Sequence, residues 1–152
     1  MPAPANYELN EVFDALAATW DGLETGDEFG GAAEILTCTS EVVGQVNVPA
    51  IVLELDDLDW DLNMADGADA FTIVATVLVK TQETKGAQRA LRTFLSRRSG
   101  AGVARLKAAL KANQSLGGLV SYAHMTSVRR VGLINYDAVD YQGAELVIEV
   151  VS

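Results

Sequence analysis

Cysteine, histidine and long apolar runs are scarce in this 152-residue sequence. The single Cys38 excludes a disulfide within the chain, and we expect it to be a small buried side chain in a reducing compartment such as the cytoplasm. Apolar runs such as 50–55 are far too short to cross a bilayer, and residues 1–11 lack the basic and apolar regions of a secretory signal. We therefore expect neither a membrane segment nor a disulfide-stabilised fold.

Almost half of the residues, 49%, are apolar, which argues against a disordered chain. A chain of this length is expected to form one domain, residues 1–152. Such a domain buries roughly 68–70% of its unfolded surface, so it needs no metal or disulfide to hold a core.

The formal net charge of −10 is divided unevenly along the chain. Residues 1–79 contain sixteen acids and no lysine or arginine, whereas residues 80–130 contain all eleven bases and one acid, Glu83. Residues 131–152 contain four acids and no base. Segments of opposite charge can orient association between copies or with partners, unless the fold interleaves them and the field averages out.

Hydrophobic periodicity predicts the element order α-β-β-β-α-α-β-β. Three helices are predicted, one capped by Asn6, one over 83–97 and a shorter one over 103–110, because their apolar residues recur at helical spacing. Their apolar positions are Leu9, Val12, Phe13, Leu16, Ala17 and Trp20; Ala87, Ala90, Leu91, Phe94 and Leu95; and Val103, Leu106, Ala109 and Leu110. Gly117 and Gly118 are predicted to adopt positive φ where the third helix ends.

Strands are predicted within 34–43, 50–55, 71–80, 119–132 and 144–151, with a turn near 136–138. Both faces of 71–80 are largely apolar, so this strand is predicted to lie near the middle of a sheet. The helix over 83–97 is predicted to pack on it through Leu91, Phe94 and Leu95.

Acidic residues occupy alternate positions at Asp57, Asp59 and Asp61, as they do in calcium loops. An EF-hand loop also needs glycine at its sixth position and an acid at its twelfth. Counting from Asp57 or from Asp59, the sixth position is leucine or methionine and the twelfth is alanine, so neither register fits. The intervening residues are apolar, which is typical of an extended segment with one exposed acidic face. No metal site is therefore predicted.

Motifs for catalysis or cofactor binding are also missing. His124 stands alone in a predicted strand, and no nucleophile lies at motif spacing from it, although Cys38 could meet it in space. The glycine-rich stretch 22–31 is acidic and would repel a phosphate. Residues 80–130 are basic, but Phe94 is the only aromatic residue of their helical part, and the net charge opposes tight binding to DNA. We expect no catalytic residue, metal or cofactor; an enzyme using Cys38 and His124, or a nucleic-acid-binding protein using 80–130, is the alternative.

Four stretches resemble, in this order, the small tail terminator proteins of long-tailed, siphovirus-type actinobacteriophages. They are "GQVNVPAIVLEL", "FTIVATVLV", "LKAALKANQSLGGLV" and "VDYQGAELVIEV", and they cover about the last two-thirds of the chain. The residues that match the family pattern are Pro49, Thr76–Val79, Leu106–Leu110, Leu116–Gly118 and Tyr141–Val150. The chain departs from that pattern in its richer acidic stretch, 56–69, and in its more basic connection, 97–106.

The resemblance implies an α+β fold, with a mostly antiparallel or mixed sheet and two or three helices packed on it. It implies a structural virion protein that forms a homo-hexameric ring at the head–tail junction, after assembly in the cytoplasm of the bacterial host. One face of the ring would bind the major tail tube protein and end its polymerisation. The other face would join the head–tail connector or stopper protein, and DNA would pass through the lumen without specific binding. A different connector of the same particle, or a tail tube subunit, is the nearest alternative.

The charge separation suggests how such a ring is held together. Closed rings use two different patches on each subunit, so part of the acidic half could meet the basic segment of the next subunit. The candidate interface residues are Arg89, Arg92, Arg97, Arg98 and Arg105 on the basic side and Asp57, Asp59 and Asp61 on the acidic side. An acidic stretch that lines the lumen and repels DNA is a second possible role for these aspartates.

Overall fold

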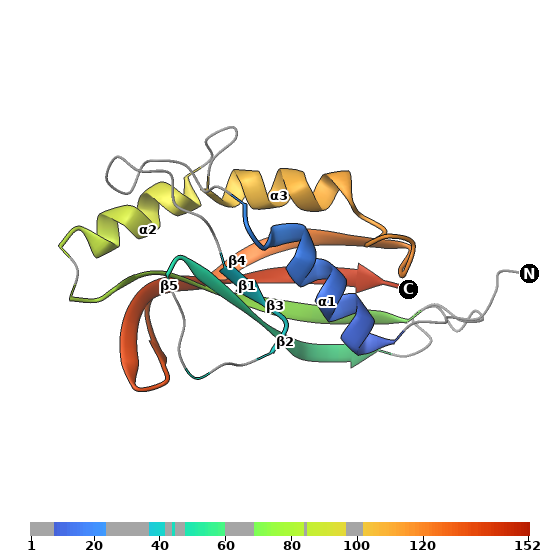
Figure 1. The fold of residues 1–152 in the computed structure, drawn as a ribbon, viewed down its shortest axis with the longest axis horizontal. Helices are drawn as coiled ribbons and strands as arrows, with labels where there is room; N and C mark the ends of the chain where they lie inside the picture. Colours follow the sequence, from blue (N-terminus) through green and yellow to red (C-terminus); the bar gives the residue numbers. More distant parts are fainter. Residues whose placement is uncertain are drawn as a thin grey trace, which may run out of the picture.

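The part of the chain that the structure describes contains three helices and five strands in the order α-β-β-β-α-α-β-β, which confirms the predicted order. The computed structural model describes residues 8–23, 37–41, 44, 48–59, 69–83, 85–96 and 102–152. The elements are α1 (Leu9–Trp20), β1 (Thr37–Thr39), β2 (Ala50–Asp59), β3 (Ala70–Thr81), α2 (Ala87–Leu95), α3 (Gly102–Ala112), β4 (Tyr122–Tyr136) and β5 (Val139–Val151) (Figure 1).

The strands form one mixed sheet with the spatial order β1-β2-β3-β5-β4. β1 is parallel to β2, and the other three pairings are antiparallel. β3 occupies the middle of the sheet, as its two apolar faces predicted. The predicted fold class, α+β with a mostly antiparallel sheet, is therefore confirmed.

Helix α1 uses its apolar stripe to cover part of the sheet. Val12, Leu16 and Trp20 are fully buried, and the Trp20 indole N–H donates a hydrogen bond to the Leu106 carbonyl of α3. The helix is capped by Glu8, whose carboxylate accepts from two backbone N–H groups of the first turn. The predicted cap, Asn6, lies outside the described residues.

Helices α2 and α3 meet over the sheet at a close backbone contact. A side chain at Gly102 would collide with the Phe94 carbonyl, so the short connection requires glycine there. Phe94 and Leu91 are buried in the core and Leu95 is partly buried against it, as predicted. α2 starts at Ala87, four residues later than predicted, because Gly86 adopts a left-handed conformation before it. None of the three described helices has the length and apolar character needed to cross a membrane.

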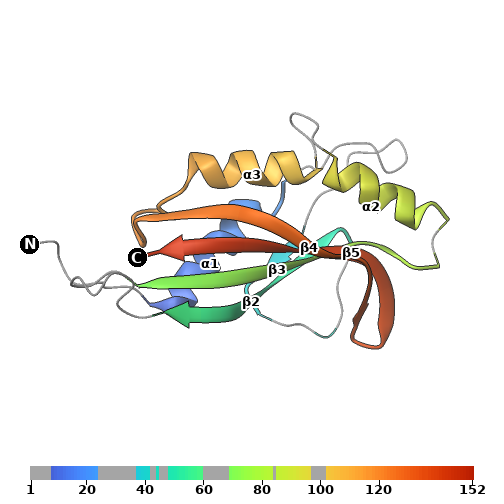
Figure 2. The same ribbon diagram turned by 180° about the vertical axis from the view of Figure 1, so that it is seen from behind.

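The long β4–β5 hairpin bends back over the sheet face opposite the helices. The bend coincides with a register shift between Arg129 and Gly132, where Arg130 has φ 52° and Gly132 has φ 131°. On β5, Gly143 allows the backbone to lie against the Val77 carbonyl. The tip then borders, together with Glu54 and Thr76 of the sheet, a cavity of about 380 Å³. Figures 1 and 2 show this curled tip at the end of the sheet remote from the carboxyl terminus.

Candidate assembly surfaces

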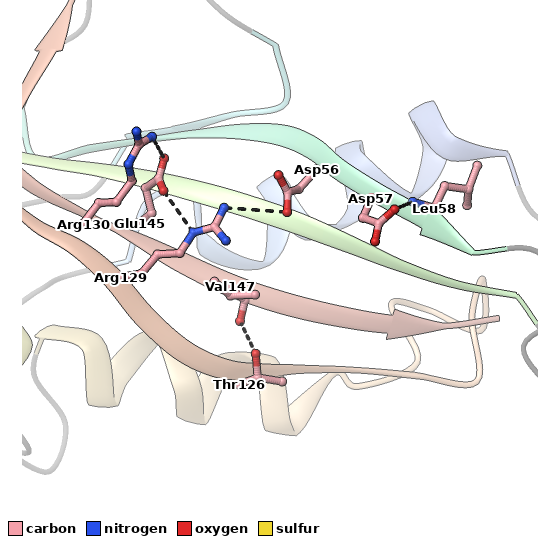
Figure 3. Close-up of polar contacts among 8 residues, drawn as sticks. All are labelled: Asp56, Asp57, Leu58, Thr126, Arg129, Arg130, Glu145 and Val147. Carbon is pink, nitrogen blue, oxygen red and sulfur yellow. Dashed lines mark hydrogen bonds and ion pairs between the residues drawn. The ribbon is translucent and has the colours of Figure 1, made fainter.

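An ion-pair network links three strands on the face opposite the helices (Figure 3). The Arg129 Nε lies 3.1 Å from Oε1 of Glu145, and the Arg130 guanidinium lies 3.4 Å from Oε2 of the same carboxylate. Arg129 also reaches Asp56 on β2, at 3.7 Å. Glu145 is largely buried beneath the two arginines, whereas Asp56 is half exposed, so the last pair is the weaker one. No local sequence pattern predicts this network, because the pairing of distant strands brings these residues together.

The separation of charge along the chain becomes a separation across the sheet. α1 and β2, from the acidic half of the sequence, expose Glu8, Glu11, Asp14, Glu54 and Asp57. The opposite side consists of β4 and α3, which expose Arg105, Lys107, Lys111, Arg129 and Arg130. Figure 2 shows β4 beneath α3 on one side of the sheet and β2 on the other. Within the described elements, therefore, the exposed charges of the two segments lie mainly on opposite sides of the sheet, and the pair between Arg129 and Asp56 is where they meet.

The predicted interface residues lie on different elements. Arg89 and Arg92 are exposed on α2, and Arg105 is exposed on α3. Asp57 is exposed on β2, where its carboxylate accepts from the Leu58 N–H (Figure 3). Arg97, Arg98 and Asp61 lie outside the described residues, and so does the side chain of Asp59. The fold does not bring the described arginines of this set to Asp57 within one subunit, so a contact between them needs a second chain.

The helical cations have no intramolecular ion pair among the residues that the structure describes. This set comprises Arg89, Arg92, Arg105, Lys107 and Lys111, all of them exposed, and Lys85 in the turn before α2 is likewise exposed and without an ion pair to a described residue. It contrasts with Arg129 and Arg130, whose charges are already matched. The helical layer therefore offers uncompensated positive charge to a partner.

Two strand edges are unpaired over most of their length in the described structure. β1 covers the outer side of β2 only from Ala50 to Val52, which leaves 53–59 open. β4 is the last strand of the sheet, and the only described backbone bond on its outer side comes from the Ala123 N–H to the Gln114 carbonyl. Open edges of this kind are templates for pairing with another chain.

A mainly apolar groove follows the outer edge of β4 beneath α3. It consists of two adjoining cavities of about 360 and 250 Å³ that share Lys107 and Met125. The larger cavity is also lined by Lys111 and His124, and the smaller by Val103 and Val128. The groove thus combines an apolar floor with lysines at its rim.

Cys38 and His124 lie at opposite edges of the sheet, on β1 and β4. Four strand spacings of about 4.8 Å separate them, so they form no catalytic pair. His124 stacks on Tyr122 with a centroid distance of 4.9 Å, and its buried Nδ1 has no partner among the described groups. No cluster of metal-ligating side chains is present in the described part of the chain. Asp61 and the side chain of Asp59, two of the three alternating aspartates, lie outside the described residues.

Comparison with known proteins adds no family assignment. No protein-family model matches the sequence, and no curated protein sequence matches it.

Proposed function

We propose that this chain is a structural protein of a long-tailed bacteriophage that forms a ring at the end of the tail tube. In this role it ends polymerisation of the major tail tube protein and provides the face that joins the head–tail connector. The proposal carries the sequence resemblance to tail terminator proteins forward, with the homo-hexamer and the virion location that it implies. Its function is closure of the tube, which requires shape and binding surfaces rather than catalysis.

The observation that supports a ring is the placement of opposite charges on opposite sides of one sheet. A contact between the acidic side of one subunit and the basic side of the next is heterologous, because it uses two different patches. Contacts of this type propagate around a ring when the rotation between neighbours closes. Exposed ion pairs contribute only about 0–1 kcal/mol each, so the charges would set orientation while apolar contact supplies most of the affinity.

The hypothesis that acidic and basic residues of neighbouring subunits pair remains part of this proposal, but only for the predicted interface residues that the structure describes. Arg89, Arg92 and Arg105 are exposed cations that form no ion pair with another described residue, and Asp57 is an exposed acid on β2. Arginine suits such a contact because its planar fork binds both oxygens of a carboxylate. The parts assigned to Arg97, Arg98, Asp59 and Asp61 stay predictions.

The test is removal of the protein from the parent phage, followed by electron microscopy of the particles. We expect tail tubes of uncontrolled length that do not join heads, and restoration by the chain supplied in trans. Normal particles without the protein would overturn the proposal.

The mass of the purified chain separates the alternatives. A tail tube subunit forms long polymers, whereas a terminator stops at a single ring or stays monomeric until it meets a tube. A stopper would leave tail length normal and affect only the joining of heads. A monomer that binds DNA at physiological salt would favour the nucleic-acid alternative.

A further inference from the structure

We infer that the outer edge of β4 and the groove beneath α3 receive the acidic β2 edge of a second copy of this chain. The contact would extend the sheet from one subunit into the next, with β2 of the second copy as the strand after β4. This inference rests on the proposed ring and names the two surfaces that would hold it together.

The strand registers of the sheet align the two open edges. Val128 pairs with Leu146, which pairs with Ala75, which pairs with Leu53, so Val128 and Leu53 lie at the same height. The same chain of pairings places Ser127 level with Glu54, and His124 level with Asp57. The open part of β4 and the open part of β2 therefore occupy the same stretch of the sheet.

The ends of the two open stretches also agree. Arg129, the next residue of β4, is level with Val52, where β1 begins to cover the outer side of β2. Beyond Arg129 the hairpin bends away, so it leaves the space that β1 of the second copy needs. At the other end, the Gln114 carbonyl occupies the edge at Ala123. A window of about five residues on each strand remains, which is a usual length for strand pairing.

Strand direction suits this pairing. Three successive antiparallel pairings separate β2 from β4, so the two strands run in opposite directions. Copies related by rotation about an axis along the strands would therefore meet as an antiparallel pair. Each strand carries one bulge in the window, at Asp56 on β2 and at Thr126 on β4, so the same number of residues separates His124 from Val128 as separates Asp57 from Leu53.

On the face of the sheet that the helices cover, called the helical face below, the side chains of β2 of the second copy complement those of β4. Leu55 is an exposed leucine, at 43%, and its pairing with Ile73 places it on the helical face, level with Met125. Met125 lines both cavities of the groove, so Leu55 of the second copy would enter that apolar space. Val128, which is 38% exposed, would be covered in the same contact.

Charge makes a second copy the occupant that fits best. On the opposite face, Glu54 and Asp57 of the second copy would lie beside Ser127 and His124, and Arg129 follows at the end of the window. The groove rim contributes Lys107 and Lys111, neither of which has an ion pair among the described residues. On the helical face the groove therefore suits Leu55, whereas Glu54 and Asp57 face Ser127, His124 and Arg129 on the other side of the sheet.

Site-directed disulfide cross-linking tests the contact. In variants Glu54→Cys and Ser127→Cys the new thiols lie three strands apart within one subunit, about 14 Å, which is too far for a bond. Across the proposed junction they would be directly opposite, with Cα atoms about 4.5–5.5 Å apart. Cys38 is buried, so we expect little background reaction from it. The control pairs Ser127→Cys with Gln88→Cys, which is also an exposed position and lies on α2.

The expected result is a cross-linked dimer only when the two single variants are mixed, at least tenfold above the control mixture. Purified particles that carry both substitutions in one chain should give a ladder of oligomers under oxidising conditions, and reductant should remove it. Particles with normal tails and no Glu54–Ser127 cross-link would overturn this inference and leave the proposed function standing. Normal particles in the absence of the protein would instead remove the proposed function, and the inference with it.

Discussion

At the scale of single residues, Cys38 shows how burial lowers the reactivity of a thiol. The side chain is 6% exposed, and the residue's backbone N–H donates to the Asp21 carboxylate at 3.0 Å. Loss of solvent, and then the negative charge of Asp21, raise the pKa of the Cys38 thiol from 9.0 to about 12. The nucleophilic thiolate is therefore almost absent at neutral pH.

We expect the native protein to react with a thiol reagent at pH 8 roughly a thousandfold more slowly than the unfolded chain, because the pKa of the Cys38 thiol differs by about three units between the two states.

Raising the pH from 9 to 11 should also lower the stability of the fold, since only the unfolded state releases the proton of the Cys38 thiol in this range. Thermal melts of the wild type and of Cys38→Ala measure the difference. An equal loss of stability in both proteins would contradict the assignment.

The side chain of Phe94 shows how the burial of one residue contributes to the packing of the core. It is fully buried where α2 meets the sheet, as the helical stripe predicted. Phe94→Ala should lower the free energy of unfolding by about 3–5 kcal/mol, because a cavity is added to the lost burial. Chemical denaturation measures this, with Leu95→Ala as the partly buried control. A smaller loss for Phe94→Ala than for Leu95→Ala would show that α2 is packed differently.

At the scale of elements, the turn of the β4–β5 hairpin carries strain. Asp137 and Ala138 form its two-residue loop with φ of 50° and 63°, the left-handed pair that favours Asp-Gly or Asn-Gly. Ala138→Gly should therefore raise the stability by about 0.5–1 kcal/mol, since glycine adopts this conformation without steric cost. Ala108→Gly in α3 is the matched control and should lower it by about 1 kcal/mol. A loss in both variants, by thermal denaturation, would rule out the strain.

The elements also show what a sequence can and cannot specify. Local periodicity was enough to predict the order of helices and strands and the central place of β3, because both depend on patterns within a few residues. The position of β5 between β3 and β4 depends on pairings between distant segments, which no local pattern specifies. The hairpin bend is missed for a related reason: Arg130 adopts a left-handed conformation that its residue type does not suggest. Among the site residues, exposed arginines on α2 and α3 were predicted, whereas the open β2 and β4 edges required the sheet order.

At the scale of the whole molecule, the two charged sides predict that salt weakens self-association. Raising the salt from about 0.1 to 1 M shortens the screening length from roughly 10 to 3 Å, which removes the attraction between exposed charges before contact. Sedimentation at several protein concentrations should show weaker association at high salt. The double variant Lys107→Glu, Lys111→Glu is the control, and its association should be weak at both salt concentrations. Association that strengthens with salt would point to a purely apolar contact.

The interior position of β5, between β3 and β4, has a consequence for folding during synthesis. β5 pairs with both β3 and β4, yet it is the last of the eight elements to leave the ribosome. A nascent chain that lacks β5 cannot join β4 to β3. The open edges of β2 and β4 therefore cannot yet take their places on the two sides of one sheet. Until β5 is made, one edge of β3 and the whole of β4 stay unpaired, and unpaired strand edges make an incomplete chain prone to aggregate.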